Sequence, residues 1–439
     1  MTNPVNTPPA RPRSVQETGL PLNFLAGLAL KAMYTRGSLL GHEIADALKL
    51  PFANVVDQVL NHLRRERLME VKGAAAVGES SYRYAYTDWG RARARELMNQ
   101  NEYSGPAPVG LEAYTARVKA QSLPSQAITP DALRRVLAHL VLSEALLNQL
   151  GPAVASGKAI FLFGNTGNGK TSIGEAVGVL PPGAIWIPYV VSVNEQIIKV
   201  FDPTQHQLIS TTAETEKRSG ALRYLSSKSE EYDQRWALIE RPFIAVGGEL
   251  TMKNFNLVYD PTTKDYQAPY QMKANGGIFL LDDFGRQRVQ PRNLLNRWIV
   301  PLEKGEDYLT LETGQKINVP FDVLVFFATN LIPEDLVDEA YLRRIRYKIY
   351  VPDPTLEELR EIFRREAAKR DISYSEEGWR YLIAEYYTKP KRTPRGVHPR
   401  DILDELVDIA RFQGIPPTLS QELLDRACRA YFLQKTDAA

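Results

Sequence analysis

Residues 159–172 read AIFLFGNTGNGKTS, which predicts a buried strand, a glycine-rich turn and the start of a helix. Four residues fit the phosphate-binding pattern G-x-x-x-x-G-K-[ST], namely Gly164, Gly169, Lys170 and Thr171. A glycine-rich turn without a ligand is the alternative. Because a strand precedes the pattern and an apolar helix follows it, we interpret the turn as a nucleotide phosphate site.

Each residue type in this turn has a chemical reason. Glycines let backbone N–H groups curl around phosphate oxygens, and the start of a helix adds unpaired donors and a favourable dipole. Lys170 is expected to place its ammonium on the β- and γ-phosphates, and the Thr171 hydroxyl is expected to ligate Mg²⁺. The predicted phosphate-binding residues are Gly164, Asn165, Thr166, Gly167, Asn168, Gly169, Lys170, Thr171 and Ser172.

Composition limits the classes of protein to which the chain can belong. Its 439 residues predict two or three domains, and a net charge of +2 gives no global field toward nucleic acid or membrane. The single cysteine, Cys428, permits no disulfide within the chain, which suits the reducing cytoplasm. No stretch reaches the roughly 18 apolar residues of a membrane helix, so membrane insertion is not expected.

The pattern along the chain predicts five segments. Residues 1–20 are polar and proline-rich and are expected to form a disordered tail. Residues 21–98 run helix, helix, helix, strand, strand, helix, with the third helix beginning at Pro51, and this order is typical of a winged helix-turn-helix. Residues 99–128 predict a linker, residues 129–350 an α/β domain, and residues 351–432 a small helical domain.

Residues 159–350 contain apolar strands that alternate with helical or polar segments. This alternation predicts a parallel sheet with helices on both faces. The clearest strands are AIFLF, AIWIPYVV (184–191), GIFLLDD (277–283) and VLVFFATN (323–330). The region 195–275 is longer than a strand–helix connection needs, and its second part predicts a β-hairpin. Met252, Phe255 and Tyr259 of that part are candidate partner contacts, although packing of the hairpin onto the body is the favoured interpretation.

Two further strands end in polar residues suited to phosphate chemistry. Asp282 and Asp283 follow one strand, so we expect Asp282 to ligate Mg²⁺ and Asp283 to orient the attacking water. Asn330 follows another strand, where its amide is expected to hold that water or touch the γ-phosphate. The alternatives are an aspartate that caps the next helix and an asparagine that starts a turn.

Taken together, these motifs resemble those of the AAA+ ATPases. Gly164–Thr171 is similar to Walker A, Phe279–Asp283 to Walker B and Asn330 to sensor 1. Residues 338–354 look like the arginine-finger region, with Arg343 and Arg344 as candidates and Arg346 behind them, and residues 396–406 look like the sensor 2 helix, with Arg400 at its start. Most of the family has glutamate as the second Walker B acid, so Asp283 implies slower hydrolysis.

The resemblance covers residues 129–430 and carries further implications. In this family the finger reaches the γ-phosphate bound by a neighbouring subunit, which implies a homo-oligomeric ring, often a hexamer. The helical domain is then a lid that moves about a hinge near Pro352 and Pro354. ATP and Mg²⁺ are the implied cofactors.

Three functions are consistent with these motifs. The first is an ATPase that remodels a macromolecule, with a protein favoured over DNA as the substrate. The second is an ATP-gated regulator that binds DNA through residues 51–95, where the net basic charge is modest. The third is a scaffold that binds ATP in order to assemble, with little turnover.

Overall fold

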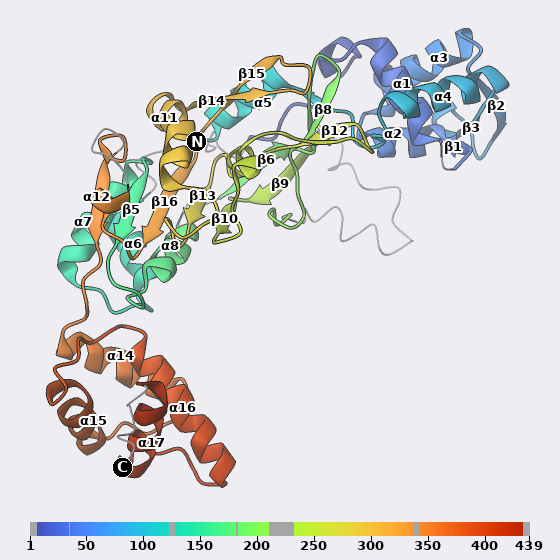
Figure 1. Ribbon diagram of the computed structural model, residues 1–439. Coiled ribbons are helices and arrows are strands. Elements are labelled where there is room, and N and C mark those ends of the chain that lie inside the picture. The colour runs from blue at the N-terminus through green and yellow to red at the C-terminus, as the bar shows by residue number, and fades with distance from the viewer. Residues whose placement is uncertain are drawn as a thin grey trace.

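The computed structural model describes residues 7–34, 36–122, 128–180, 183–209, 232–336 and 342–432. They form an N-terminal unit, a central α/β core and a C-terminal helical unit, which follow one another through space as they do along the chain (Figure 1). Residues 210–231, in the first part of the long region 195–275, therefore lie outside the described part, as do residues 338–341 of the expected finger region 338–354.

A five-stranded parallel sheet forms the centre of the core. Its order is β10-β13-β16-β5-β17, with every neighbouring pair parallel. The strands are β10 (Phe243–Val246), β13 (Ile278–Leu281), β16 (Leu324–Thr329), β5 (Ile160–Phe163) and β17 (Tyr347–Tyr350). The strand that leads into the phosphate loop, residues 164–171, lies between two others, so both of its edges are paired.

Helices cover both faces of this sheet because apolar side chains point alternately to either side. On one face Phe161, Phe279 and Phe327 pack against α11 (Pro291–Lys304) through Trp298. The other face packs against α6 (Pro130–Leu137), α7 (Glu144–Ala155) and α8 (Lys170–Gly178). The predicted fold class, a parallel α/β sheet with helices on both faces, is confirmed.

Two strand assignments made from the sequence are wrong. The run AIWIPYVV does not enter the parallel sheet: β6 (Ala184–Pro188) pairs antiparallel with β9 (Trp236–Glu240), and β7 (Val190–Val193) joins a second sheet. Conversely, β10 comes from the region predicted to form a hairpin and is an edge strand of the parallel sheet. The predicted hairpin itself is present in the same region, where β11 (Val258–Asp260) pairs antiparallel with β12 (Asp265–Gln267). An apolar run predicts burial but does not specify which sheet buries it, and this explains both errors.

The second sheet has the order β11-β12-β8-β7-β4 and lies between the parallel sheet and the N-terminal unit. Its strands are β4 (Val109–Gly110), β7, β8 (Gln196–Lys199), β11 (Val258–Asp260) and β12 (Asp265–Gln267). It shares a core with α5 (Leu111–Ala120) and the hairpin β14 (Glu306–Thr310)–β15 (Lys316–Pro320). The expected linker over 99–128 thus contains a strand and a helix, because Tyr114 and Val118 supply apolar side chains for this core.

The candidate contact residues of the insertion are mostly packed. Phe255 is fully buried between Phe279 and Trp298, at ring-centroid distances of 6.3 and 5.0 Å. Tyr259 lies 5.0 Å from Tyr266 between ring centroids, and Met252 packs against the core of the parallel sheet. The structure supports the packing interpretation for these side chains.

The N-terminal unit follows the predicted order with one strand added. It contains α1 (Leu22–Ala32), β1 (Ser38–Leu40), α2 (Gly41–Leu48), α3 (Asp57–Arg65), β2 (Met69–Ala74), β3 (Tyr82–Tyr86) and α4 (Asp88–Gln100). The strands form an antiparallel sheet with the order β1-β3-β2. Regular α3 begins at Asp57 rather than at Pro51, because Asn54 has a φ of 65° that interrupts the helix.

Residues 7–20, expected to belong to a disordered tail, are packed instead. The Asp233 N–H donates to the Pro9 carbonyl at 2.9 Å, and the Arg235 guanidinium donates to the Thr18 carbonyl at 2.8 Å. Leu20 is buried in the core of the N-terminal unit. A polar, proline-rich composition predicted no burial, yet backbone groups of this segment find partners near β9.

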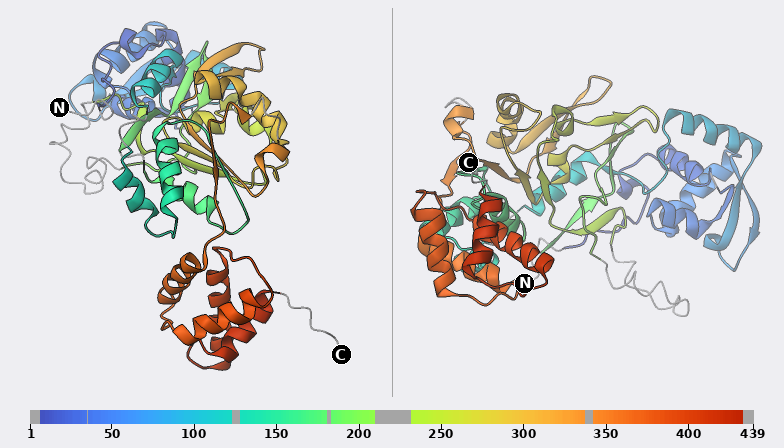
Figure 2. Two further views of the ribbon diagram at one scale, coloured as in Figure 1. Left: turned by 90° about the vertical axis from the view of Figure 1, so that its left-hand side faces the viewer. Right: turned by 60° about the horizontal axis from the view of Figure 1, so that its bottom comes forward.

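The C-terminal unit consists of α14 (Leu356–Ala368), α15 (Glu376–Ile383), α16 (His398–Gln413) and α17 (Gln421–Tyr431). It has its own apolar core and hangs from the α/β core by the segment that follows β17 (Figure 2). Cys428 lies in that core, where burial raises the pKa of its thiol to about 12. Among the described residues, none of the helices has the length and apolar character needed to cross a bilayer.

Candidate functional site

A cavity of about 590 Å³ lies between the carboxyl edge of the parallel sheet and the C-terminal unit. The phosphate loop forms its floor, and residues 139–142 together with α14 and α16 form its walls. Nine residues predicted from the sequence line it: Thr166, Gly167, Asn168, Gly169, Lys170, Thr171, Ser172, Asp282 and Asp283. Asn330 and Arg400 line it as well, so the structure brings most of the predicted site together.

The phosphate loop needs glycine at positions where no side chain fits. Gly164 has a φ of 143°, and a Cβ there would lie 2.3 Å from the carbonyl oxygen of Val351. Gly167 has a φ of 83°, and its Cβ would lie 2.5 Å from Val397 of the C-terminal unit. The pattern of glycines is therefore fixed both by backbone conformation and by close neighbours.

Lys170 begins α8 and is buried beneath the loop. Its Nζ donates to the carbonyls of Gly164 at 3.0 Å and of Asn165 at 2.9 Å. Burial lowers the pKa of this ammonium, and the negative charges of Asp282 and Asp283 oppose that effect. The ammonium is thus held at the loop by carbonyls that a phosphate oxygen can replace.

Thr171 and Asp282 meet across the site. The Thr171 hydroxyl donates to Oδ2 of Asp282 at 2.9 Å, and Asp282 is held by Gln287, whose Nε2 donates to its carbonyl at 2.8 Å. Hydroxyl and carboxylate oxygens are ligands that Mg²⁺ accepts, and it usually completes its six positions with phosphate oxygens and water. Within the described part of the chain, no group of three or more His, Cys, Asp or Glu side chains could hold a metal ion.

Asp283 and Asn330 lie at the same edge of the sheet. Asp283 is exposed, adopts a φ of 48°, and donates its backbone N–H to Asp282 Oδ1 at 3.0 Å. Asn330 donates from Nδ2 to the Thr166 hydroxyl at 3.1 Å, which ties strand β16 to the phosphate loop. Its Oδ1 is buried and accepts no hydrogen bond from the described residues, so it is free to accept one from a ligand or water.

Arg343 and Arg344 are placed away from this cavity. They line a second cavity of about 550 Å³ with Lys158, Glu303 and Arg346. Arg344 Nε pairs with Glu303 at 2.7 Å, and Arg343 is exposed. The structure of one chain therefore does not bring these arginines to its own phosphate loop.

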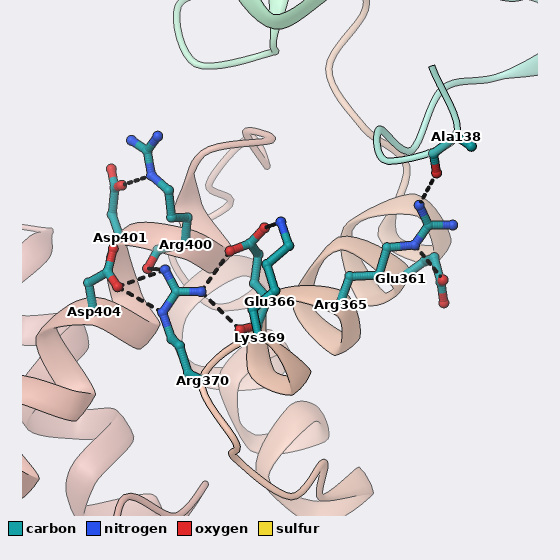
Figure 3. Close-up of polar contacts among 9 residues, drawn as sticks. All are labelled: Ala138, Glu361, Arg365, Glu366, Lys369, Arg370, Arg400, Asp401 and Asp404. Carbon is teal, nitrogen blue, oxygen red and sulfur yellow. Dashed lines mark hydrogen bonds and ion pairs between the residues drawn. The ribbon is translucent and has the colours of Figure 1, made fainter. Parts of the chain in front are cut away.

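Besides the predicted Arg400, the C-terminal unit adds charged residues that the sequence did not single out. Arg365 donates to the carbonyl of Ala138 at 2.8 Å, and Glu366 accepts from Lys369 and Arg370, both at 2.6 Å (Figure 3). Arg400 lies in the first turn of α16, where its Nε donates to Asp401 at 2.9 Å, and its guanidinium extends away from Arg370 (Figure 3). The cavity thus has basic groups on the side that faces the phosphate loop.

Two further residues connect the phosphate loop to the C-terminal unit and were missed. Asp353 bonds to Asn165 and Asn168 of the loop and pairs with Arg395. The family resemblance implied a hinge near Pro352 and Pro354, on either side of Asp353, but no motif includes the Asp353 side chain.

The apolar wall of the cavity was also missed, because its residues come from three separate segments of the chain: Leu140, Val141, Leu142, Ile362 and Val397.

Comparisons with known proteins cover parts of this chain. A family model described as a domain of unknown function (DUF8689) matches residues 355–430, which is the C-terminal helical unit. No curated protein matches the chain.

Solved structures show a partial likeness. NtrX from Brucella abortus has 15% sequence identity and a TM-score of 0.39 over 64% of this chain and 53% of that one. A second NtrX structure, in complex with ADP, has the same identity and TM-score over 76% and 64%. A mutant of RuvB from Thermotoga maritima has 11% identity and a TM-score of 0.37 over 70% and 72%.

This chain spans 53% and 64% of the two NtrX chains, less than two thirds of their length. At TM-scores under 0.5, these likenesses carry no argument about the fold. The fold is identified by the strand order of the parallel sheet and by the phosphate loop that follows β5.

Proposed function

We propose that this chain is an AAA+ ATPase that binds ATP with Mg²⁺ in the 590 Å³ cavity and hydrolyses it. The observation that carries the proposal is the 2.9 Å contact between the Thr171 hydroxyl and Asp282. It brings the residue after the phosphate-loop lysine to the acid at the end of a neighbouring parallel strand. A site of this kind binds a nucleotide phosphate chain together with a metal ion.

Each residue would act through a contact that the geometry allows. The backbone N–H groups of the loop and of the first turn of α8 would hold the phosphates. Lys170 Nζ would exchange the carbonyls of Gly164 and Asn165 for β- and γ-phosphate oxygens. Thr171 and Asp282 would hold Mg²⁺, whose charge offsets the charge that develops on the leaving phosphate. The apolar residues Val141, Ile362 and Val397 would pack against the adenine ring of the nucleotide.

The water that attacks the γ-phosphate would be held by two groups. Asp283 is the exposed carboxylate at the cavity and would accept a proton from that water. The unpaired Oδ1 of Asn330 would accept a hydrogen bond from the same water. Arg400 would approach the phosphates from the C-terminal unit, which would act as a lid.

We propose that Arg343 or Arg344 completes the site of a neighbouring copy, so that turnover depends on a homo-oligomer, most simply a hexameric ring. Their distance from their own phosphate loop and the exposure of Arg343 support this arrangement. An arginine supplied in this way contributes on the order of 10³-fold or more to turnover.

A mixing experiment tests the shared site. Neither the Lys170→Ala chain nor the Arg343→Ala/Arg344→Ala chain is expected to turn over ATP at an appreciable rate. A mixture is expected to recover part of the wild-type rate, because an intact loop meets intact arginines at some interfaces. Phosphate release measured over a series of mixing ratios checks this. A rate that equals the sum of the two separate chains at every ratio would contradict the shared site.

The N-terminal unit makes DNA a second candidate partner. We propose that this unit is a winged helix, since α3 is followed by the β2–β3 hairpin. Arg64 and Arg65 at the end of α3 are exposed, as are Arg67 in the turn that follows, Arg83 on β3 and Arg91 on α4. These side chains could contact phosphates, but they do not form the dense basic stripe of most DNA readers. A protein remains the favoured partner.

Turnover measurements separate the three functions. Hydrolysis that duplex DNA does not change is expected for a protein remodeller, whereas stimulation by DNA with binding that weakens steeply as salt rises indicates the DNA-gated regulator. Tight Mg²⁺-dependent ATP binding with negligible hydrolysis, in the oligomer, indicates the scaffold. Absence of ATP binding in the presence of Mg²⁺ would contradict all three.

A further inference from the structure

The side chain of Asp353 joins the phosphate loop to the lid. Asn165 Nδ2 donates to its two carboxylate oxygens at 3.1 and 3.0 Å, and Asn168 Nδ2 donates to Oδ1 at 2.7 Å. The guanidinium of Arg395, which precedes α16, pairs with the same carboxylate. A single acidic side chain in the hinge therefore has partners in both parts.

Burial and charge make these contacts stronger than surface pairs. The Asp353 side chain is 22% exposed, and Asn168 is buried. Burial opposes ionisation of Asp353, but hydrogen bonds from Asn168 and Asn165 and the charge of Arg395 outweigh it and lower the pKa of the carboxyl group. The group is thus a carboxylate at neutral pH, and Asn165, Asn168 and Arg395 all act as donors to it.

Both the nitrogen and the oxygen of the Asn168 side-chain amide form hydrogen bonds, one with the hinge and the other with the lid. Its Nδ2 also donates to the Pro352 carbonyl at 3.2 Å, and its Oδ1 accepts from the Gly396 N–H at 3.2 Å. Next to it, Gly167 lies so close to Val397 that no side chain would fit. The shape of the loop on this side is therefore set by residues 352–353 and 395–397.

We propose that Asp353 is a positioning residue for nucleotide binding: through Asn165 and Asn168 it sets the shape of the phosphate loop, and through Arg395 it makes that shape depend on where the lid lies. The proposal rests on the proposed nucleotide site. Asn165 and Asn168 occupy unspecified positions of the phosphate-binding pattern, so the pattern assigns a role to their backbone N–H groups but none to their side chains. Because coupling between two sites is reciprocal, a nucleotide on the loop would also bias the position of the lid.

The substitution Asp353→Asn removes the negative charge and one acceptor oxygen while it keeps the size of the side chain. An amide has one acceptor oxygen, and its NH₂ group would face the NH₂ groups of Asn165 and Asn168. The substitution also removes the carboxylate with which Arg395 pairs. The loop is then expected to sample other shapes, and binding would have to restore the native one.

The test uses the full chain with Asp353→Asn and a matched control. We expect the KM for Mg-ATP to rise about tenfold while kcat stays within twofold, because the chemical groups are untouched. Hydrogen exchange of residues 164–169 is expected to become faster in the protein without nucleotide. The control is Asp408→Asn, which breaks the exposed ion pair with Arg411 on α16. It is expected to leave the KM, the kcat and the exchange rate of residues 164–169 unchanged.

A mutant cycle shows whether Asp353 acts through the asparagines. In a chain with Asn165→Ala and Asn168→Ala, adding Asp353→Asn is expected to raise the KM by less than twofold. A full tenfold effect on that background, or wild-type exchange and KM in the single variant, would overturn the proposal. If Asp353→Asn fails to fold, Arg395→Gln applies the same two readouts to the lid side of the contact, with the same expected directions.

The outcomes also separate this inference from the proposed function. If the wild-type chain binds no nucleotide, the ATPase proposal fails. The exchange comparison needs no nucleotide, and unchanged exchange of residues 164–169 in Asp353→Asn would overturn the role of Asp353 by itself.

Discussion

Replacing Lys170 with alanine is expected to weaken the binding of Mg-ATP about 100-fold and to abolish turnover. Its Nζ lies within 3.0 Å of two loop carbonyls, so it is already at the position from which phosphate oxygens can be reached. Hydrogen bonds to a charged group contribute up to about 3 kcal/mol, which corresponds to roughly 100-fold in a dissociation constant. Equilibrium binding of a fluorescent ATP analogue with Mg²⁺ measures the change.

The control for this variant is Lys253→Ala. Lys253 is an exposed lysine that does not line the cavity, so its loss tests whether removal of a positive charge alone reduces binding. It is expected to leave the affinity within twofold of wild type. If Lys170→Ala retains nearly wild-type affinity while its thermal unfolding is unchanged, the ammonium does not contact the phosphates.

Replacing Asp283 with asparagine is expected to preserve ATP binding and to lower turnover by about 10²- to 10⁴-fold. A group that accepts a proton in the transition state contributes roughly this factor. The backbone of Asp283 has a φ of 48°, which asparagine tolerates as well as aspartate does, so the local conformation should survive. Phosphate release and nucleotide affinity, measured on the same preparation, separate chemistry from binding.

Asp131→Asn provides the comparison for Asp283→Asn. Asp131 is exposed in the first turn of α6, away from the cavity, and its substitution is expected to leave turnover unchanged. Hydrolysis at the parental rate in Asp283→Asn would show that another group orients the water. Asp282 would then be the next acid to substitute.

Local pattern predicted how the residues at the centre of the candidate site are arranged. Strand β5, the phosphate loop and α8 follow one another in the sequence, so their pattern specifies their geometry directly. Asp282 and Asn330 were also predictable, because polar residues that follow buried parallel strands must gather at one edge of the sheet. The 2.9 Å contact between Thr171 and Asp282 is the result of that rule.

Long-range pairing explains what the sequence did not reveal. Strand β10 and the run AIWIPYVV are both apolar, and only their hydrogen-bonded neighbours distinguish the parallel sheet from the second one. Asp353 contacts Asn165, Asn168 and Arg395, which lie far from it in sequence or outside any motif, so sequence pattern could not reveal these contacts. Residues 7–20 gained order through backbone contacts near β9, which composition does not predict.

The most direct test of the central claim is a structure of the chain with a non-hydrolysable ATP analogue and Mg²⁺. We expect the triphosphate on the backbone N–H groups of residues 165–171, with the metal held by the Thr171 hydroxyl next to Asp282. A nucleotide bound elsewhere, or phosphates that make no contact with this loop, would contradict the central claim.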